Sequence, residues 1–188
     1  MLPDVLRRIF RFINRYFMVP MFRLGLGAFI GNPVTGYIMV LKTRGRKWGL
    51  PRYSPVNYAI LNGGVYCLAG WGRASDWYRN LVANPQIELI LPGGTFTGRA
   101  ETVADVDEKR IAMRQVLKNG GFAGYLEGFN PYSITDEELA AKAAEAVLVR
   151  VQLNGLGSGA ADPGGWLWML VWGGSLLALL LGSRRSRR

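Results

Sequence analysis

The sequence contains no histidine and only one cysteine among its 188 residues. Without histidine, the chain cannot build a Ser-His-Asp triad, a histidine-ligated metal site or a haem with a histidine ligand. A single cysteine, Cys67, permits neither an intrachain disulfide nor a CxxC redox pair. We expect no metal site, and the apolar run VYCLAG predicts that Cys67 is a core residue.

Acidic residues are scarce relative to basic ones. The chain carries 23 Lys and Arg against 13 Asp and Glu, a formal net charge of +10. This excess favours an anionic partner: a phosphate, a nucleic acid or an acidic membrane surface. The cations gather in residues 1–24, in residues 42–52 and in the last five positions. Since no helix-turn-helix, zinc or aromatic RNA-binding pattern accompanies them, we do not expect nucleic acid to be the partner.

The spacing of apolar residues predicts an α+β fold. Residues 1–24 are expected to form a basic amphipathic segment whose helix ends before Pro20. Pro55 predicts an edge or a bulge in the expected strand 52–60. Turn signals such as LNGG separate the apolar runs. We therefore expect residues 25–153 to form a small antiparallel β-barrel with flanking helices. The expected strands are 37–43, 52–60, 65–70, 86–91, 95–103 and 146–153, and the expected helices are 76–84, 105–119 and a short one capped by Thr135 and Glu138.

The C-terminal part differs in composition. Residues 154–165 (NGLGSGAADPGG) predict a linker, and residues 166–182 form an uncharged apolar run before the arginine-rich end. A core helix is the alternative, weakened by the linker before it and the arginines after it. We interpret residues 166–188 as a hydrophobic anchor, expected to be a transmembrane helix, although Gly173-Gly174 leaves a re-entrant or interfacial segment open.

A run of cations in residues 43–55 (TRGRKWGLPRYSP) is the main candidate for a binding site. Arg44, Arg46, Lys47 and Arg52 lie there between two expected strands. One interpretation is a solvated turn. The other is a cradle for a phosphate, because glycines let the backbone approach closely and the cations can pair with the anion. The position between two strands favours the cradle.

This stretch, followed by LAGWG (68–72) and DWYRNLVANP (76–85), resembles the deazaflavin-dependent nitroreductase family, whose members bind coenzyme F420. The resemblance lies in the combination and order of the motifs and covers roughly residues 20–103. It implies a split β-barrel similar to that of flavin reductases. It also implies an oxidoreductase that passes a hydride from reduced F420 to a nitro compound, a quinone or another activated double bond.

The resemblance also implies a set of coenzyme-binding residues. Arg46 and Lys47 match the GRKxG turn that holds the phosphate and acidic tail, and Trp48 departs from the serine that is usual there. F420 carries a phosphodiester and an oligoglutamate tail, so Arg and Lys are suitable partners. The deazaflavin supplies the hydride chemistry, so the lack of histidine is no obstacle. The other matched positions are Arg52, Ser54, Pro55, Ala69, Gly70, Trp71, Gly72, Trp77 and Asn80.

For the hydride acceptor we expect a lipophilic small molecule. Tyr58, Tyr125 and Tyr132 are candidates for donating an O–H to an acceptor oxygen, whereas the aromatic stretch 120–134 could instead be a hydrophobic plug of the barrel. The features together predict a membrane-associated F420-dependent oxidoreductase with its barrel in the cytoplasm. The rival hypotheses are an FMN-dependent reductase on the same fold and a barrel that binds a lipid or tetrapyrrole-like ligand without turnover. Homodimerisation is left open.

Overall fold

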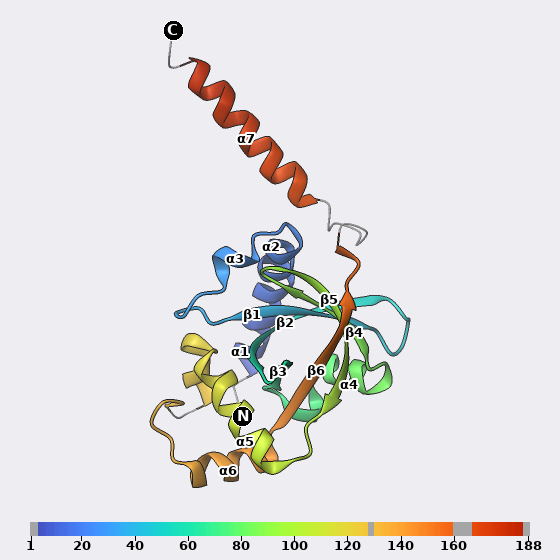
Figure 1. Ribbon diagram of the computed structural model, residues 1–188, viewed down its shortest axis with the longest axis vertical. Coiled ribbons are helices and arrows are strands. Elements are labelled where there is room, and N and C mark those ends of the chain that lie inside the picture. Colours follow the sequence, from blue (N-terminus) through green and yellow to red (C-terminus); the bar gives the residue numbers. More distant parts are fainter. Residues whose placement is uncertain (1–3, 128–129, 160–166, 186–188) are drawn as a thin grey trace.

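The computed structural model describes residues 4–127, 130–159 and 167–185, and its centre is a closed antiparallel β-barrel (Figure 1). In this part of the chain, six strands follow one another around the barrel in the order β1-β2-β3-β6-β5-β4. The predicted antiparallel barrel with flanking helices is confirmed. The strands are β1 Ile38–Arg44, β2 Pro51–Leu61, β3 Gly64–Ala69, β4 Gln86–Leu91, β5 Gly94–Thr102 and β6 Val147–Leu156.

Local turn chemistry sets the register of the β2–β3 hairpin. Asn62 and Gly63 have φ values of 49° and 78°, and left-handed residues at both central positions favour a two-residue hairpin turn. β3 pairs with β2 only at Tyr58 and beyond. Pro55 therefore lies in the part of β2 that has a strand partner on one side only, as expected of a residue that lacks an N–H.

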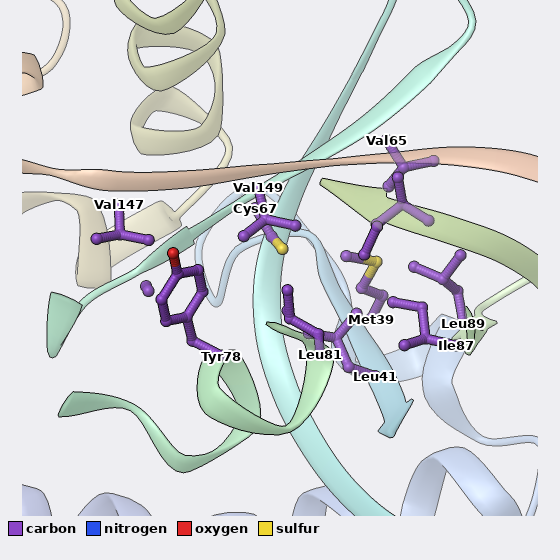
Figure 2. Packing of buried hydrophobic residues seen from close by; sticks show 13 residues of the cluster. Met39, Leu41, Val65, Cys67, Tyr78, Leu81, Ile87, Leu89, Val147 and Val149 are labelled. Atoms are coloured by element: carbon purple, nitrogen blue, oxygen red, sulfur yellow. The ribbon is translucent and has the colours of Figure 1, made fainter. Parts of the chain in front are cut away.

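The barrel interior is filled by apolar side chains from alternate positions of the strands (Figure 2). Cys67 is fully buried among them, which confirms the prediction of a core thiol, and burial raises the pKa of this thiol to about 12. Tyr78 and Leu81 of α4 (Asp76–Ala83) close the interior from one end. These two buried side chains fix α4 against the barrel.

Two further helices cover the opposite part of the barrel (Figure 1). α5 (Val106–Lys118) begins at Asp105, whose carboxylate accepts a hydrogen bond from the Glu108 N–H at 2.7 Å. α6 (Asp136–Glu145) has the predicted capping box of Thr135 and Glu138. Short 3₁₀ turns occupy Gly72–Ala74 (η2) and Gly121–Glu127 (η3).

The N-terminal segment is helical through Pro20, so the prediction that this proline ends the helix is wrong. α1 (Asp4–Ile13) continues into a π-helical segment, η1 (Asn14–Met18), and then into α2 (Val19–Arg23). In η1 the Val19 N–H bonds to the Asn14 carbonyl, and Pro20 falls in the first turn of α2, where a missing N–H is tolerated. Buried Met18 and Phe22 pack on Val40 and fasten this end to the barrel, followed by α3 (Gly27–Ile30).

β6 is longer than expected. Leu156 pairs with Phe96 of β5, and just beyond the strand the Ser158 N–H donates to a Glu88 carboxylate oxygen at 2.9 Å. Lys42 Nζ donates to Ser158 Oγ at 2.9 Å and forms an ion pair with Glu88 at 3.1 Å. The expected linker 154–165 therefore begins as a strand that remains attached to β1 and β4, while residues 160–166 lie outside the described residues.

α7 (Leu167–Arg185) projects away from the barrel (Figure 1), with the Trp172 ring 5.8 Å from the Phe29 ring of α3. Along the described part of α7 the apolar side chains are exposed. Among the described residues, no helix is both long and apolar enough to cross a membrane. The predicted transmembrane helix is thus unsupported, and the last three residues of the arginine-rich end lie outside the description.

Candidate functional site

A cavity of about 820 Å³ opens on the side of the barrel where β1 turns into β2. Its walls come from the N-terminal helical segment between Phe10 and Val19, from the β1–β2 turn with the first half of β2, and from the start of α4. An excess of cations around such a space favours an anionic ligand. The described lining includes one carboxylate, that of Asp76, and five cations: Arg11, Arg15, Arg46, Lys47 and Arg52.

The β1–β2 turn is tight and depends on two glycines. The Gly45 N–H donates to the Leu50 carbonyl at 2.9 Å, and the Gly49 N–H donates to the Gly45 carbonyl at 2.8 Å. Gly49 has a φ of +67°, a conformation that favours glycine, and a Cβ on Gly45 would lie 3.0 Å from the Leu50 carbonyl oxygen. Lys47 and Trp48 project from this turn, and the Trp48 side chain lines the cavity while remaining 78% exposed.

Arg46 is held in place by α4. Its Nη2 donates to the Asp76 carboxylate at 2.9 Å, and its Nη1 donates to Asn80 Oδ1 at 3.0 Å. The Arg46 backbone N–H also donates to Asn80 Oδ1, at 3.3 Å, and Asn80 is only 5% exposed. Asn80 therefore ties the turn to the helix. In the part of the chain that the structure describes, Lys47 and Arg52 form no ion pair, so their charges are available to a ligand.

Ser75 is a lining residue outside the set that the resemblance implies. It occupies the N-cap position of α4 and lines the cavity, but its side chain caps nothing. The residue is 2% exposed and its buried hydroxyl has no hydrogen-bond partner. A buried hydroxyl without a partner is costly, and the first N–H groups of a helix also lack acceptors within the helix. An anion at the start of α4 would satisfy both features.

The structure brings together most of the coenzyme-binding residues implied by the resemblance. The exceptions are Ala69, which is buried in the barrel core, and Gly70 and Gly72, which lie in the adjacent loop. Sequence motifs gave no sign that the N-terminal segment forms a wall of the cavity, because those residues are distant along the chain. Of the residues implied by the resemblance, the following line the cavity: Arg46, Lys47, Arg52, Ser54, Pro55, Trp71, Trp77 and Asn80.

The three candidate tyrosines do not line this cavity. Tyr58 is half-buried against the barrel core. Burial, and to a smaller extent the neighbouring Tyr37, raises the pKa of its phenol, so the O–H stays protonated. Tyr125 is half-exposed. Tyr132 is exposed, its O–H donates to the Lys118 carbonyl at 3.4 Å, and the Lys118 ammonium lies 5.6 Å from its ring centroid. Their role toward an acceptor stays a prediction.

The structure thus defines a small closed β-barrel with a cationic cavity at its side. A family model described as F420H(2)-dependent quinone reductase matches residues 18–134, and the chain belongs to that family. It is therefore an oxidoreductase, and its cofactor is coenzyme F420. The resemblance to F420-dependent reductases noted in the sequence is confirmed.

The chain is 28% identical over 129 residues to an F420H(2)-dependent quinone reductase of Mycobacterium tuberculosis (strain H37Rv), a match that spans 62% of this chain and 86% of the relative. Among solved structures, an F420-H2 dependent reductase (FDR-A) is similar with a TM-score of 0.41 and 21% identity over 62% of this chain and 93% of that one. The heme storage protein HutZ of Vibrio cholerae is similar with a TM-score of 0.42 and 17% identity over 75% of this chain and 91% of that one. Both structural similarities concern the fold alone.

Proposed function

We propose that the cationic cavity binds coenzyme F420 and that the protein uses the reduced coenzyme to reduce a quinone-like lipophilic acceptor. The observation that carries this proposal is the convergence on one cavity of the β1–β2 cations and of the unpartnered Ser75 hydroxyl at the start of α4. The donor set suits the coenzyme, because F420 carries a phosphodiester and several glutamate carboxylates. Arg, Lys and a helix N-terminus all form charge-assisted hydrogen bonds with such groups.

In this proposal, different parts of the cavity bind different groups of the coenzyme. Lys47 and Arg52 pair with the acidic tail, while Ser75 Oγ and the α4 N–H groups donate to the phosphate. Arg46 is pre-oriented by Asp76 and Asn80 and adds a fixed positive charge at the same wall. Reduced F420 supplies the hydride when it is bound.

The uncharged lining is the second part of the site. Ser54 and Pro55 on β2, together with Trp71 and Trp77, supply less polar surface next to the cations. Such surface suits a flat ring system and excludes water from it.

Coenzyme titration tests this proposal. We expect F420 fluorescence to change on binding to the full chain, and the Lys47→Ala/Arg52→Ala variant to bind about tenfold or more weakly, because it removes two unpaired cations at the cavity. Arg8→Ala/Arg99→Ala is the matched control, since both side chains are exposed and neither lines the cavity. Equal F420 affinity of the wild type and Lys47→Ala/Arg52→Ala would refute the assignment of this cavity as the coenzyme site.

The lining of the same cavity also bears on which molecule accepts the hydride. Phe10, Val19 and Trp48 add apolar lining to the cavity, which is compatible with a lipophilic quinone. A nitro compound or an activated C=C bond is the competing acceptor. Rates of F420H₂ oxidation with a short-chain quinone, a nitroaromatic and an enone separate these, and the quinone is expected to react fastest.

We further propose that the protein works at a lipid surface with its barrel in the cytoplasm. The N-terminal segment exposes a run of apolar side chains, with Phe12 65% and Tyr16 61% exposed, and the apolar side chains of α7 are exposed too. Large exposed apolar surfaces favour association with lipid or protein. Co-sedimentation with anionic phospholipid vesicles is expected for the full chain and should weaken in Phe12→Ser/Tyr16→Ser. Equal sedimentation of both proteins would contradict a role of this helix.

A further inference from the structure

The N-terminal helical segment presents polar side chains to the cavity while part of its apolar surface stays exposed. Its polar side chains, Arg11, Asn14 and Arg15, line the cavity. Its apolar side chains are divided: Phe10 and Val19 also line the cavity, whereas Ile9 is 48% and Ile13 41% exposed. A helix that packed for hydrophobic burial alone would turn the apolar face to the barrel. Exposed apolar side chains at Ile9 and Ile13, combined with polar side chains at the cavity, are what a ligand in the cavity would explain.

The segment is fastened to the barrel at one end. Met18 and Phe22 are buried next to Val40, and the Arg23 guanidinium lies 4.8 Å from the Tyr53 ring centroid. Residues before Met18 lie along the cavity, and the π-helical segment that starts at Asn14 interrupts the regular α-helix at this place. Such π-helical interruptions often occur at functional sites. The described hydrophobic attachment thus lies at Met18 and Phe22, beyond the stretch that carries Arg11 and Arg15.

The charges of the two walls make this arrangement unfavourable without an anion. Arg11 and Arg15 on the helix share the cavity with Lys47 of the β1–β2 turn and Arg52 of β2. The lining described contains one carboxylate, Asp76, which already pairs with Arg46. Like charges that converge on one space repel each other, whereas an anion between them is attracted by both walls.

We infer that Arg11 and Arg15 are coenzyme-binding residues that contact the anionic phosphate or glutamate tail from the side opposite the β1–β2 turn. This inference rests on the proposed function of the cavity. It assigns the coenzyme a second wall that lies outside residues 18–134, the part of the chain that the family model matches. It also makes the helix a clamp: the bound tail joins the N-terminal segment to the barrel at a second place besides Met18 and Phe22.

The test compares Arg11→Gln/Arg15→Gln with the control Arg8→Gln/Arg99→Gln, which removes the same charge from exposed positions outside the cavity. Each full-length protein is titrated by fluorescence with F420 and with the deazaflavin chromophore that lacks phosphate and tail. We expect Arg11→Gln/Arg15→Gln to bind F420 about tenfold more weakly, because exposed charge pairs contribute up to about fivefold each. Its affinity for the tail-less chromophore should be unchanged, and the control should stay within about twofold of the wild type.

Hydrogen exchange provides a second readout that does not depend on activity. F420 should slow amide exchange of residues 8–17 in the wild type and much less in Arg11→Gln/Arg15→Gln, because the clamp then lacks its cations. The inference is overturned if this variant binds F420 as tightly as the wild type while Lys47→Ala/Arg52→Ala binds weakly, an outcome that leaves the proposed function intact. Equal weakening for F420 and the tail-less chromophore also overturns it. If the wild type binds neither ligand, the proposed function itself fails.

Discussion

Replacement of Ser75 by alanine should change stability and coenzyme affinity in opposite directions. The Ser75 hydroxyl is buried, lacks a hydrogen-bond partner and does not cap α4. An unsatisfied buried hydroxyl costs about 1–3 kcal/mol, and the loss of a cap that is not formed costs little. We therefore expect Ser75→Ala to stabilise the coenzyme-free protein by about 1 kcal/mol, which raises Tm by about 2–4 °C in a chain of this size.

The same substitution should weaken F420 binding by about tenfold, because it removes one donor to a charged phosphate oxygen. Thermal unfolding with and without F420 and a fluorescence titration measure the two effects in one preparation. Ser133→Ala is the control, because Ser133 is exposed and remote from the cavity, and neither quantity should change. A Ser75→Ala protein that is less stable than the wild type would show that the hydroxyl has a structural partner. A more stable protein with unchanged affinity would refute the phosphate site at α4.

Three further predictions concern the framework around the site. Asn80→Ala should lower stability by about 2 kcal/mol in urea unfolding, since Asn80 accepts two hydrogen bonds from Arg46; a loss below about 0.5 kcal/mol would contradict the tie between turn and helix. Burial opposes ionisation of Glu88, but hydrogen bonds from Ser158 and the Lys42 ammonium lower its pKa below the ordinary 4.5. The ionised Glu88 therefore contributes to folding stability above pH 4.5, and this contribution is lost as the pH falls through the lowered pKa. Glu88→Gln should therefore be about 1 kcal/mol less stable than the wild type at pH 7 and nearly equal to it well below pH 4, as followed by urea unfolding at each pH; a constant difference would refute the assignment. Cys67, with its raised pKa and complete burial, should react with a thiol reagent at pH 8 only after unfolding, and rapid labelling of the native protein would contradict its place in the core.

Much of the fold could be predicted because its signals are local. Alternating apolar residues and the Asn62-Gly63 turn define the β2–β3 hairpin, and Thr135 with Glu138 defines the start of α6. Longer elements departed from expectation where tertiary contacts intervened. Pro20 is accommodated inside a helix that the barrel surface holds through Phe22, and β6 continues to Leu156 because β5 offers a partner for it.

For the candidate site, the sequence by itself determined the cations of the β1–β2 turn, the glycines that shape this turn and the absence of histidine chemistry. These are properties of short stretches and of composition, which do not depend on distant residues. Only the tertiary structure decided that Asn80 fastens Arg46, that the Ser75 hydroxyl is buried without a partner, and that Arg11 and Arg15 face the same cavity. Each of these depends on where the chain's helices pack against the closed barrel, and burial and charge convergence exist only after that packing has formed.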